Sequence, residues 1–292
     1  MPDSRTAKPV SPPAAVSAPP DAFAFGRNWQ RYVSRYMTPE RERAASDSMR
    51  DLLELDLTGL TFLDIGAGSG LFSLCAHRMG AGRVISVDVD PDAVDSCRAL
   101  RQAAGGPSTW EVIEGSILDP KLVAGLEAAD VLYSWGVLHH TGDMYTAIAN
   151  AAQLVKPGGV VGMGIYNRAS GPFLDSERWL RIKRAYNHSP RVVQIVLERL
   201  YGADWVLKQL RHRRNPLTVA RQRRTRRMAV WTDLVDWLGG YPYEFARAHE
   251  IVSFCEGRCG LTAKKVLAVP DWSPSNNQFV FERLTARAEG EQ

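Results

Sequence analysis

Cysteine is scarce in this chain of 292 residues, which holds only Cys75, Cys97, Cys255 and Cys259. Four cysteines without a paired framework exclude a small disulfide-stapled secreted fold and favour a reducing cytoplasm. Cys255 and Cys259 would share one face of a helix. Because a second cysteine pair and nearby histidines are missing, ordinary buried thiols are favoured over a metal site, and we expect no metal.

Long apolar runs are also absent. No stretch approaches the roughly 20 apolar residues that a membrane span requires, so no span is expected. Residues 1–21 are rich in Pro, Ala and Ser and lack the charged-then-apolar pattern of a signal peptide, so we expect a flexible tail. The hydrophobic content of 45% is nevertheless enough for a substantial buried core.

Acidic residues are scarce in one segment. Residues 178–227 hold 15 Lys or Arg against Glu198 and Asp204, a formal net charge of +13, whereas the whole chain carries +4. The remainder of the chain therefore carries −9. This basic segment is a clue to a binding partner, because guanidinium groups suit phosphate and carboxylate.

The apolar pattern alternates between strands and helices. Strands are predicted at 62–65, 83–88, 110–113, 130–135, 160–166, 263–269 and 278–283, and helices at 71–79, 92–101, 147–155 and 245–256, with one or two more within 23–57. This alternation favours an α/β fold with a parallel sheet covered by helices on both faces. The last two strands are close enough in sequence to be antiparallel neighbours.

A glycine-rich loop follows the first predicted strand and precedes a helix. Residues 64–70 read Asp-Ile-Gly-Ala-Gly-Ser-Gly, which differs from the G-x-G-x-x-G spacing of dinucleotide binders. Glycines allow close approach of a ligand to the backbone. Asp88 ends the second strand, 20 residues after Gly68, where a carboxylate can accept the hydroxyls of a ribose. The alternative is a tight turn that binds nothing.

These residues resemble a known family. Residues 64–70 resemble the first motif of class I S-adenosylmethionine-dependent methyltransferases, and Asp88 matches the ribose-binding acid of that family. Residues 114–119 resemble its adenine-binding segment, with Ser116 where many relatives carry Asp. Residues 133–140 resemble its fourth motif, and residues 156–159 the turn before its fifth strand. More narrowly, residues 25–29, 133–143 and 233–244 resemble a bacterial small-molecule branch related to ubiquinone-pathway O-methyltransferases.

The resemblance implies a Rossmann-like, mostly parallel seven-stranded sheet with an antiparallel last strand. It divides the chain into a tail (1–21), an N-terminal helical lid (22–57), a cofactor-binding core (58–167 and 241–286) and a basic helical insertion (168–240) that covers the acceptor. The implied cofactor is S-adenosyl-L-methionine. Its binding residues are then Asp64, Gly66, Ala67, Gly68, Gly70, Asp88, Val89, Ser116, Ile117 and Trp135.

Candidate catalytic residues follow from the end of the fourth and fifth strands, where open α/β sheets bind ligands. His139 and His140 are candidate general bases, His139 first, and Tyr166 closes the fifth strand. The alternative for His139 is a ring that packs beside the adenosine or caps the next helix. The acceptor-binding candidates are Trp29, Tyr36, Asn167, Arg223, Arg227, Tyr241, Tyr243 and Glu244. Ordinary strand-end polarity is the alternative for Tyr166 and Asn167, and a plain Gly-Gly-Tyr-Pro turn is the alternative for Tyr241, Tyr243 and Glu244.

We expect a small anionic acceptor, such as a phosphorylated, diphosphorylated or nucleotide-linked molecule, in natural-product or surface-polysaccharide biosynthesis. One alternative is carbon methylation of a prenyl diphosphate, and another is a solvated helix face with no acceptor role. The competing class is an RNA methyltransferase or RNA-binding module, although the basic run lacks interleaved aromatics for stacking bases, so nucleic acid is not the expected partner. A protein that has lost catalysis is a further rival. The sequence leaves the oligomeric state open.

Overall fold

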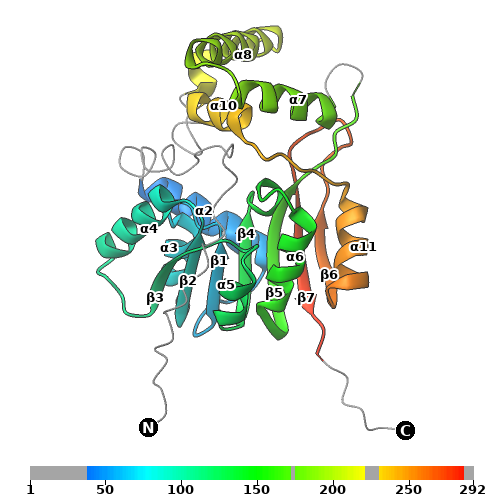
Figure 1. Ribbon diagram of the computed structural model, residues 1–292. Coiled ribbons are helices and arrows are strands. Elements are labelled where there is room, and N and C mark those ends of the chain that lie inside the picture. The colour runs from blue at the N-terminus through cyan, green and yellow to red at the C-terminus, as the bar shows by residue number, and fades with distance from the viewer. Residues whose placement is uncertain (1–37, 172–174, 221–229, 286–292) are drawn as a thin grey trace, which may run out of the picture.

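The computed structural model describes residues 38–171, 175–220 and 230–285. Its core is one seven-stranded sheet in the order β3-β2-β1-β4-β5-β7-β6 (Figure 1). The strands are β1 (Thr61–Ile65), β2 (Arg83–Asp88), β3 (Trp110–Glu114), β4 (Ala129–Trp135), β5 (Val155–Tyr166), β6 (Leu261–Leu267) and β7 (Asn276–Arg283). β7 is antiparallel to both β5 and β6, and the pairs among β1 to β5 are parallel.

The described helices connect and cover these strands. They are α2 (Pro39–Leu53), α3 (Leu71–Arg78), α4 (Pro91–Ala103), α5 (Pro120–Gly125), α6 (Met144–Gln153), α7 (Ser176–Asn187), α8 (Arg191–Arg211), α10 (Val230–Gly239) and α11 (Ala248–Arg258), with a 3₁₀ turn, η1 (Leu138–His140). None of the described helices combines the length and the apolarity that crossing a bilayer requires.

Two apolar layers hold the sheet between helices. On one face, α2, α3 and α4 pack Met49, Leu74 and Leu100 against buried strand residues such as Phe62 and Tyr133. On the other face, α6 and α11 pack side chains such as Ile148 and Ile251 against the sheet. Because β1 and β2 are buried on both faces, their sequences are nearly continuous apolar runs, which is the signature of a parallel strand.

The order of the strands reverses direction between β1 and β4. The chain moves outward from β1 to β2 and β3, returns, and then continues through β4 and β5 on the other side of β1. The loops after β1 and β4 therefore diverge at the carboxyl edge, which is the position where open α/β sheets bind ligands. The glycine loop and the His139–His140 pair follow these two strands.

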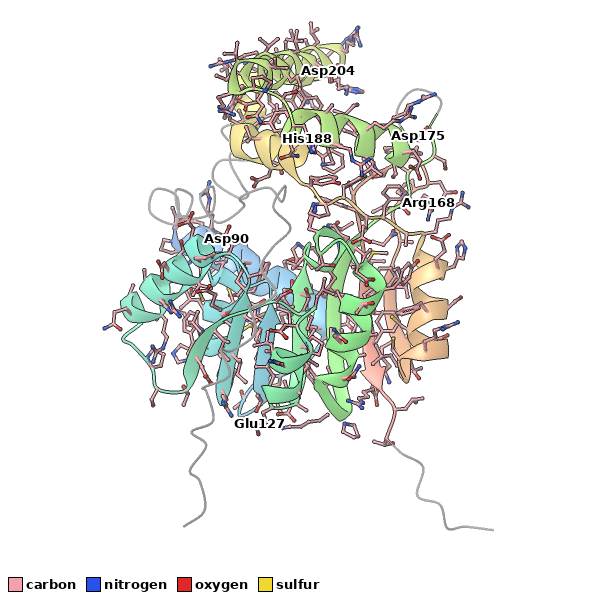
Figure 2. The ribbon with its side chains drawn as sticks, viewed as in Figure 1. Asp90, Glu127, Arg168, Asp175, His188 and Asp204 are labelled. Carbon is pink, nitrogen blue, oxygen red and sulfur yellow. The ribbon has the colours of Figure 1, made fainter. Side chains whose placement is uncertain are left out.

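Helices α7, α8 and α10 lie beyond this carboxyl edge, with α8 outermost (Figure 1). They share a separate apolar cluster that contains Trp179, Tyr186, Leu234, Leu238 and Tyr243. Figure 2 shows Asp90 at the carboxyl edge and Asp175, His188 and Asp204 beyond it, with Glu127 at the opposite end of the molecule. The described part of the basic segment, up to residue 220, thus lies beyond the strand ends together with α10.

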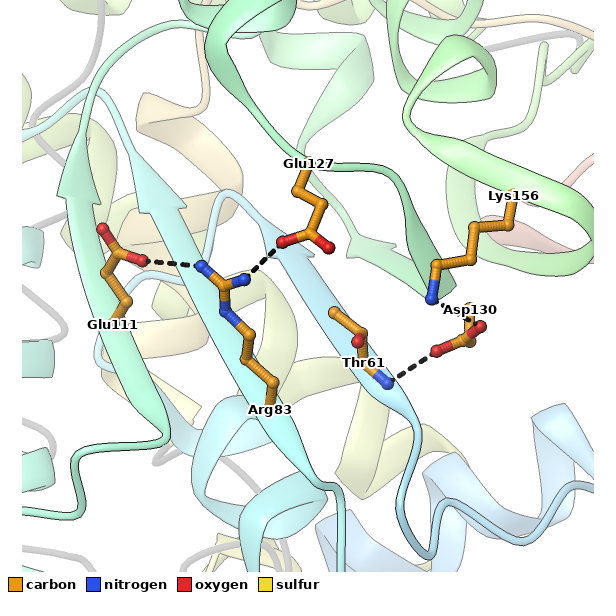
Figure 3. Close-up of polar contacts among 6 residues, drawn as sticks. All are labelled: Thr61, Arg83, Glu111, Glu127, Asp130 and Lys156. Atoms are coloured by element: carbon orange, nitrogen blue, oxygen red, sulfur yellow. Dashed lines mark hydrogen bonds and ion pairs between the residues drawn. The ribbon is translucent and has the colours of Figure 1, made fainter.

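Ion pairs join neighbouring strands at the opposite edge (Figure 3). Arg83 of β2 bonds to Glu111 of β3, with 3.3 Å between Nη2 and Oε2, and also to Glu127 before β4. Asp130 accepts the Thr61 N–H at 2.9 Å and pairs with Lys156 at 2.9 Å. Although partial burial opposes it, these two donors lower the pKa of Asp130. Exposed pairs of this kind contribute little stability individually, so the burial of the sheet dominates.

Most predicted elements are confirmed with shifted ends, and one helix was missed. The helix α5 begins at Pro120, and the carboxylate of the preceding Asp119 accepts the Lys121 N–H at 2.9 Å. An Asp-Pro pair in a sequence is typical of such a helix start. β5 begins at Val155 rather than residue 160, because Val155 already pairs with Ala129 ahead of a register shift. The α6 helix therefore ends at Gln153, before the predicted end at 155. Within the predicted lid, α2 packs against the sheet.

Two buried asparagines lock β5 to β7 beside the carboxyl edge. Asn277 is fully buried, and its Nδ2 donates to Asn167 Oδ1 at 3.1 Å while its Oδ1 accepts the Val269 N–H at 2.9 Å. Asn167 Nδ2 in turn donates to the carbonyl of Ser273 at 2.9 Å. These bonds fix the chain as it leaves β5.

We therefore expect Asn277→Ala to lower the free energy of unfolding by about 1–3 kcal/mol, because it leaves buried polar groups without partners. Chemical denaturation monitored by circular dichroism measures this change. Asn276→Ala is the matched control, since Asn276 Oδ1 has no partner among the described residues. Equal effects of the two substitutions would show that the asparagine pair does not stabilise this edge.

Candidate active site

Three glycines of the loop after β1 have left-handed backbone angles, with φ of +73° at Gly66, +56° at Gly68 and +82° at Gly70. A β-carbon on Gly66 would lie 2.3 Å from Val137 Cγ1, and one on Gly70 would lie 2.6 Å from Cys97 Sγ. Glycine is therefore required at both positions by conformation and by space. The loop turns directly into α3, which starts after Gly70.

Asp88 ties the end of β2 to this loop. Its Oδ2 accepts the N–H of Gly68 at 2.7 Å, and its Oδ1 accepts the N–H of Asp90 at 2.9 Å. Burial raises the pKa of Asp88 to about 6, although these backbone donors oppose the shift. A carboxyl with this pKa is stabilised in its charged form when further hydroxyl donors reach it. The neighbouring Val89 is partly exposed.

Asp64 ends a buried chain of hydrogen bonds that crosses β1 and β2. Trp110 Nε1 donates to Ser86 Oγ at 2.8 Å, and the Ser86 hydroxyl donates to Ser73 Oγ at 2.7 Å. Ser73 Oγ donates to Asp64 Oδ2 at 2.6 Å. Burial raises the pKa of Asp64 to about 7, and Asp88 adds to this shift, whereas Ser73 opposes it. This series of hydrogen bonds fixes the Asp64 carboxyl at the start of the glycine loop.

The predicted adenine side is only partly free of protein contacts. Ser116 Oγ accepts the N–H of Leu118 at 3.2 Å, and Ala67 N–H donates to the carbonyl of Val87 at 3.0 Å. Ile117 is 4% exposed and belongs to the core cluster. Trp135 stacks on Tyr133, with centroids 6.0 Å apart and planes 6° apart, and keeps part of its surface exposed. The protein itself thus occupies much of the surface of Ile117.

His139 and His140 form the η1 turn that follows β4. His139 is fully buried, and neither ring nitrogen has a hydrogen-bond partner among the described residues. Burial lowers its pKa well below the usual range, and the charges of His140 and Lys183 act in the same direction. His140 Nδ1 is bonded to the carbonyl of Pro242, and burial lowers its pKa to about 3. Both rings are therefore neutral at neutral pH.

Tyr166 joins these histidines to α10. Its ring centroid lies 4.0 Å from that of His139, 5.3 Å from that of His140 and 5.5 Å from that of Trp237. The ring centroid of Tyr243 lies 5.3 Å from that of Tyr166, and the Tyr243 hydroxyl lies beside Ser176. The Trp237 Nε1 is buried without a partner among the described residues. We call His139, His140, Tyr166, Lys183, Trp237 and Tyr243 the aromatic cluster.

Lys183 of α7 is the charged member of the aromatic cluster. It is fully buried, and its Nζ lies 4.1 Å from the ring centroid of Trp237 and 4.7 Å from that of Tyr243. Its Nζ also donates to the carbonyl of Trp237. Within the described part of the chain, Lys183 forms no ion pair with a carboxylate. Burial lowers its pKa to about 7, although Asp236 opposes the shift.

The other predicted acceptor residues bind the protein itself. Asn167 is 2% exposed, and its side-chain amide is engaged in the lock between β5 and β7. Glu244 accepts the N–H of Met144 at 3.1 Å and caps α6, while its own N–H donates to the carbonyl of His139 at 2.9 Å. Tyr241 lies at the surface of the cluster, where its hydroxyl accepts from Arg184 Nη2 at 3.3 Å.

Some of the predicted site residues lie outside the described structure, and two residues of the aromatic cluster were not predicted. Trp29, Tyr36, Arg223 and Arg227 lie outside the described residues. Lys183 and Trp237 were not predicted, although Lys183 lies between apolar helical positions such as Trp179 and Tyr186, a periodicity that places it on the buried face of its helix. That pattern is the one sequence signal that could have identified Lys183.

The loop edge fits the nucleoside that the motif resemblance implies. The loop has no β-carbon at Gly66, Gly68 or Gly70, and the Asp88 carboxyl lies beside it with a raised pKa. Sugar hydroxyls donating to Asp88 would offset its burial, and the positive charge of a sulfonium favours ionised Asp64 and Asp88. The residues present therefore fit an adenosyl sulfonium.

Comparisons with known proteins agree with this geometry. Residues 63–163 match the family model described as a methyltransferase domain. A ubiquinone biosynthesis O-methyltransferase from Paramagnetospirillum magneticum is 33% identical over 130 residues, which are 44% of this chain and 50% of the relative. A ribosomal protein L11 methyltransferase from Hamiltonella defensa is 31% identical over 153 residues, which are 46% of each chain. The chain thus spans about half the length of these relatives.

Solved structures share the fold. An O-methyltransferase family protein from Burkholderia thailandensis superimposes with a TM-score of 0.51 at 17% identity, covering 84% of this chain and 58% of that protein. The magnesium protoporphyrin IX methyltransferase of Synechocystis, solved with bound SAH, gives 0.51 at 14% identity, covering 88% and 93%. The family match assigns residues 63–163 to a methyltransferase domain, and the sheet order, the glycine loop and the bond from Asp88 to that loop agree with this assignment.

Proposed function

We propose that this protein transfers the methyl group of S-adenosylmethionine to a small acceptor that carries an anionic group or an acidic hydroxyl. The observation that carries the acceptor part is the buried Lys183 ammonium, which lies over the rings of Trp237 and Tyr243 and whose charge is only partly offset by Asp236. Burial has removed the water that would otherwise solvate this ammonium group. A negatively charged group of the ligand would offset that loss, so a buried cation favours an anionic ligand.

S-adenosylmethionine supplies a methyl carbon activated by the positive sulfonium, so that an acceptor atom can displace the thioether directly. Under this proposal Asp88 binds the ribose hydroxyls, and the loop from Gly66 to Gly70 binds the amino-acid end with Asp64. The chain's main contribution is alignment of the acceptor atom with the methyl group, which is worth on the order of 7–11 kcal/mol in well-oriented reactions.

His139 is the proposed base when the acceptor must lose a proton. Its ring is neutral, has no hydrogen-bond partner among the described residues and contacts Tyr166 at the end of β5. A neutral imidazole nitrogen can accept the proton of an acceptor hydroxyl as the new bond to carbon forms. Tyr166, Tyr243 and Trp237 would then line the acceptor, and Tyr241 would lie at its outer side.

The names of the relatives do not identify the acceptor of this protein. Ribosomal protein L11 methyltransferases and ubiquinone biosynthesis O-methyltransferases both match, over less than half of this chain. The anionic small acceptor, RNA and a prenyl diphosphate all draw on arginines of the basic segment, of which Arg223 and Arg227 lie outside the described residues. Lys183 supports an anionic small acceptor independently of those arginines, and a diphosphate is one such acceptor.

Incubation of the protein with methyl-labelled S-adenosylmethionine and a panel of phosphorylated, diphosphorylated, nucleotide-linked and phenolic compounds tests this function. We expect one labelled small product, identified by mass spectrometry, with one equivalent of S-adenosylhomocysteine. In the same assay His139→Phe should slow turnover by about 10²–10⁴-fold for an acceptor that loses a proton. Label that enters only RNA or protein would refute the small-molecule proposal.

Cofactor binding should tighten as the pH rises from about 5 to 7.5. The pKa of Asp88 is about 6, so its carboxyl is protonated at the lower pH and cannot accept both ribose hydroxyls. Asp88→Asn should weaken binding by about 10- to 100-fold and reduce its pH dependence, because a charge-assisted hydrogen bond is lost. Isothermal titration with S-adenosylmethionine measures both effects. Asp95→Asn, on the exposed side of α4, is the matched control.

Acceptor binding should weaken as the pH rises through about 7. The pKa of Lys183 is about 7, so its side chain is positively charged below this pH and loses its proton and its charge above it. For the acceptor found in the labelling assay, Lys183→Met should lower kcat/KM by roughly 10- to 100-fold, with unchanged cofactor affinity. Lys183→Arg should keep activity at high pH, since arginine stays charged.

Lys264→Met is the matched control, because Lys264 is an exposed residue of β6. An unchanged kcat/KM in Lys183→Met would exclude acceptor binding by Lys183.

A further inference from the structure

The outermost helix, α8, presents a row of apolar side chains to the solvent. Val193, Val196, Leu200, Ala203, Leu207 and Leu210 recur at three- and four-residue steps and so share one face of the helix. The five larger side chains of this row are between 43% and 63% exposed, and Val192 beside them is 73% exposed. We call these six residues at three- and four-residue steps the outer stripe.

The outer stripe does not hold α8 in place. The opposite face packs Leu197 and Tyr201 against the cluster of α7 and α10. Buried Glu198 on that face accepts the Tyr186 hydroxyl at 2.8 Å and pairs with Arg191 at 2.7 Å. Figure 2 shows Asp204 of α8 at the end of the molecule opposite to Glu127. A surface helix normally places polar residues where this stripe lies, so its apolar character indicates an interaction.

Basic side chains flank the outer stripe. Arg199 lies on one side, with its guanidinium 4.9 Å from the ring centroid of Trp231. Lys208 and Arg211 lie on the other side, and Arg213 and Arg214 follow directly after the helix, all exposed. The acidic residues of α8 are Glu198, which is buried, and Asp204, which pairs with Lys208 at 2.7 Å. The solvent-facing side of α8 is therefore apolar in the middle and positive at its margins.

We propose that α8 docks on the surface of a membrane that contains anionic phospholipid. Helices with an apolar face bordered by Lys and Arg lie in the interfacial plane, with the apolar residues at the acyl boundary and the cations at the phosphates. The 21 residues of α8 span roughly 31 Å along the surface. The charge of the margins selects an anionic over a neutral lipid surface. This proposal is independent of the acceptor.

Two other occupants fit less well. The heptad-like spacing of the outer stripe would suit a second copy of α8. Pairing two copies, however, would bring the cations around Arg199 and Arg211 of each chain close to those of the other, with Asp204 as the one partly exposed acid. RNA is disfavoured because the outer stripe has no aromatic side chain on which a base could stack.

Co-sedimentation of the full chain with vesicles tests the docking. We expect at least about 10-fold stronger binding to vesicles of phosphatidylcholine with about 30% phosphatidylglycerol than to pure phosphatidylcholine, and weaker binding in high salt. The exposed double variant Leu200→Glu, Leu207→Glu should lose binding by more than about 10-fold while keeping its circular dichroism spectrum and melting temperature. Lys208→Glu with Arg211→Glu should remove the preference for the anionic vesicles.

The matched control is Leu267→Glu with Leu284→Glu, two exposed leucines on β6 and after β7 that carry the same change away from α8. This control should bind vesicles like the unmodified protein. Equal loss in both double variants, or no binding of the unmodified chain to anionic vesicles, overturns the proposal. A dimer in analytical ultracentrifugation that Leu200→Glu, Leu207→Glu splits, without vesicle binding, would assign the outer stripe to a second copy instead.

Discussion

The hydrogen bond between the Asp88 carboxyl and the Gly68 N–H is the interaction on which the cofactor edge depends. It joins the end of β2 to a loop that begins at the end of β1, and so fixes the distance between the two elements that we propose bind the nucleoside. The bond is made where burial raises the pKa of Asp88, so the free protein keeps the carboxyl in a costly environment. A ligand that donates hydroxyls to it is stabilised by the same environment.

The two sides of the carboxyl edge satisfy their polar groups differently. On the cofactor side, the chain from Trp110 through Ser86 and Ser73 to Asp64 pairs each buried group with the next, which makes this side rigid. On the proposed acceptor side, the rings of His139 and Trp237 have nitrogen atoms without a hydrogen-bond partner among the described residues. Unpaired buried atoms of this kind cost free energy unless a ligand binds them. This difference is consistent with the proposal that the Asp64 side holds the cofactor and the His139 side faces the acceptor.

The insertion separates two uses of charge. Lys183 lies on the inner face of the helices beyond the strand ends. Its ammonium group is fully buried there and packs against the ring of Trp237. Arg199 and Arg211 of α8 flank the outer stripe and are exposed to the solvent. The net charge of the segment alone cannot distinguish these two, because it counts a buried ammonium and a solvated guanidinium alike. Their opposite placement is why we assign an acceptor role to one and a lipid-surface role to the other.

The parallel sheet, the loop from Gly66 to Gly70 and the position of Asp88 could be predicted from local sequence patterns. These features depend on residues that are close in sequence. Strands buried on both faces need continuous apolar runs, and left-handed turns need glycine. Asp88 is recognised as the last residue of the strand that follows the glycine loop and its helix. The tertiary structure alone decided that Lys183 meets Trp237 and Tyr243, that Asn167 locks β5 to β7 rather than facing an acceptor, and that Glu244 caps α6. Those contacts join residues 54 to 110 positions apart. No local pattern encodes them, because they depend on how helices from a distant insertion pack over the strand ends.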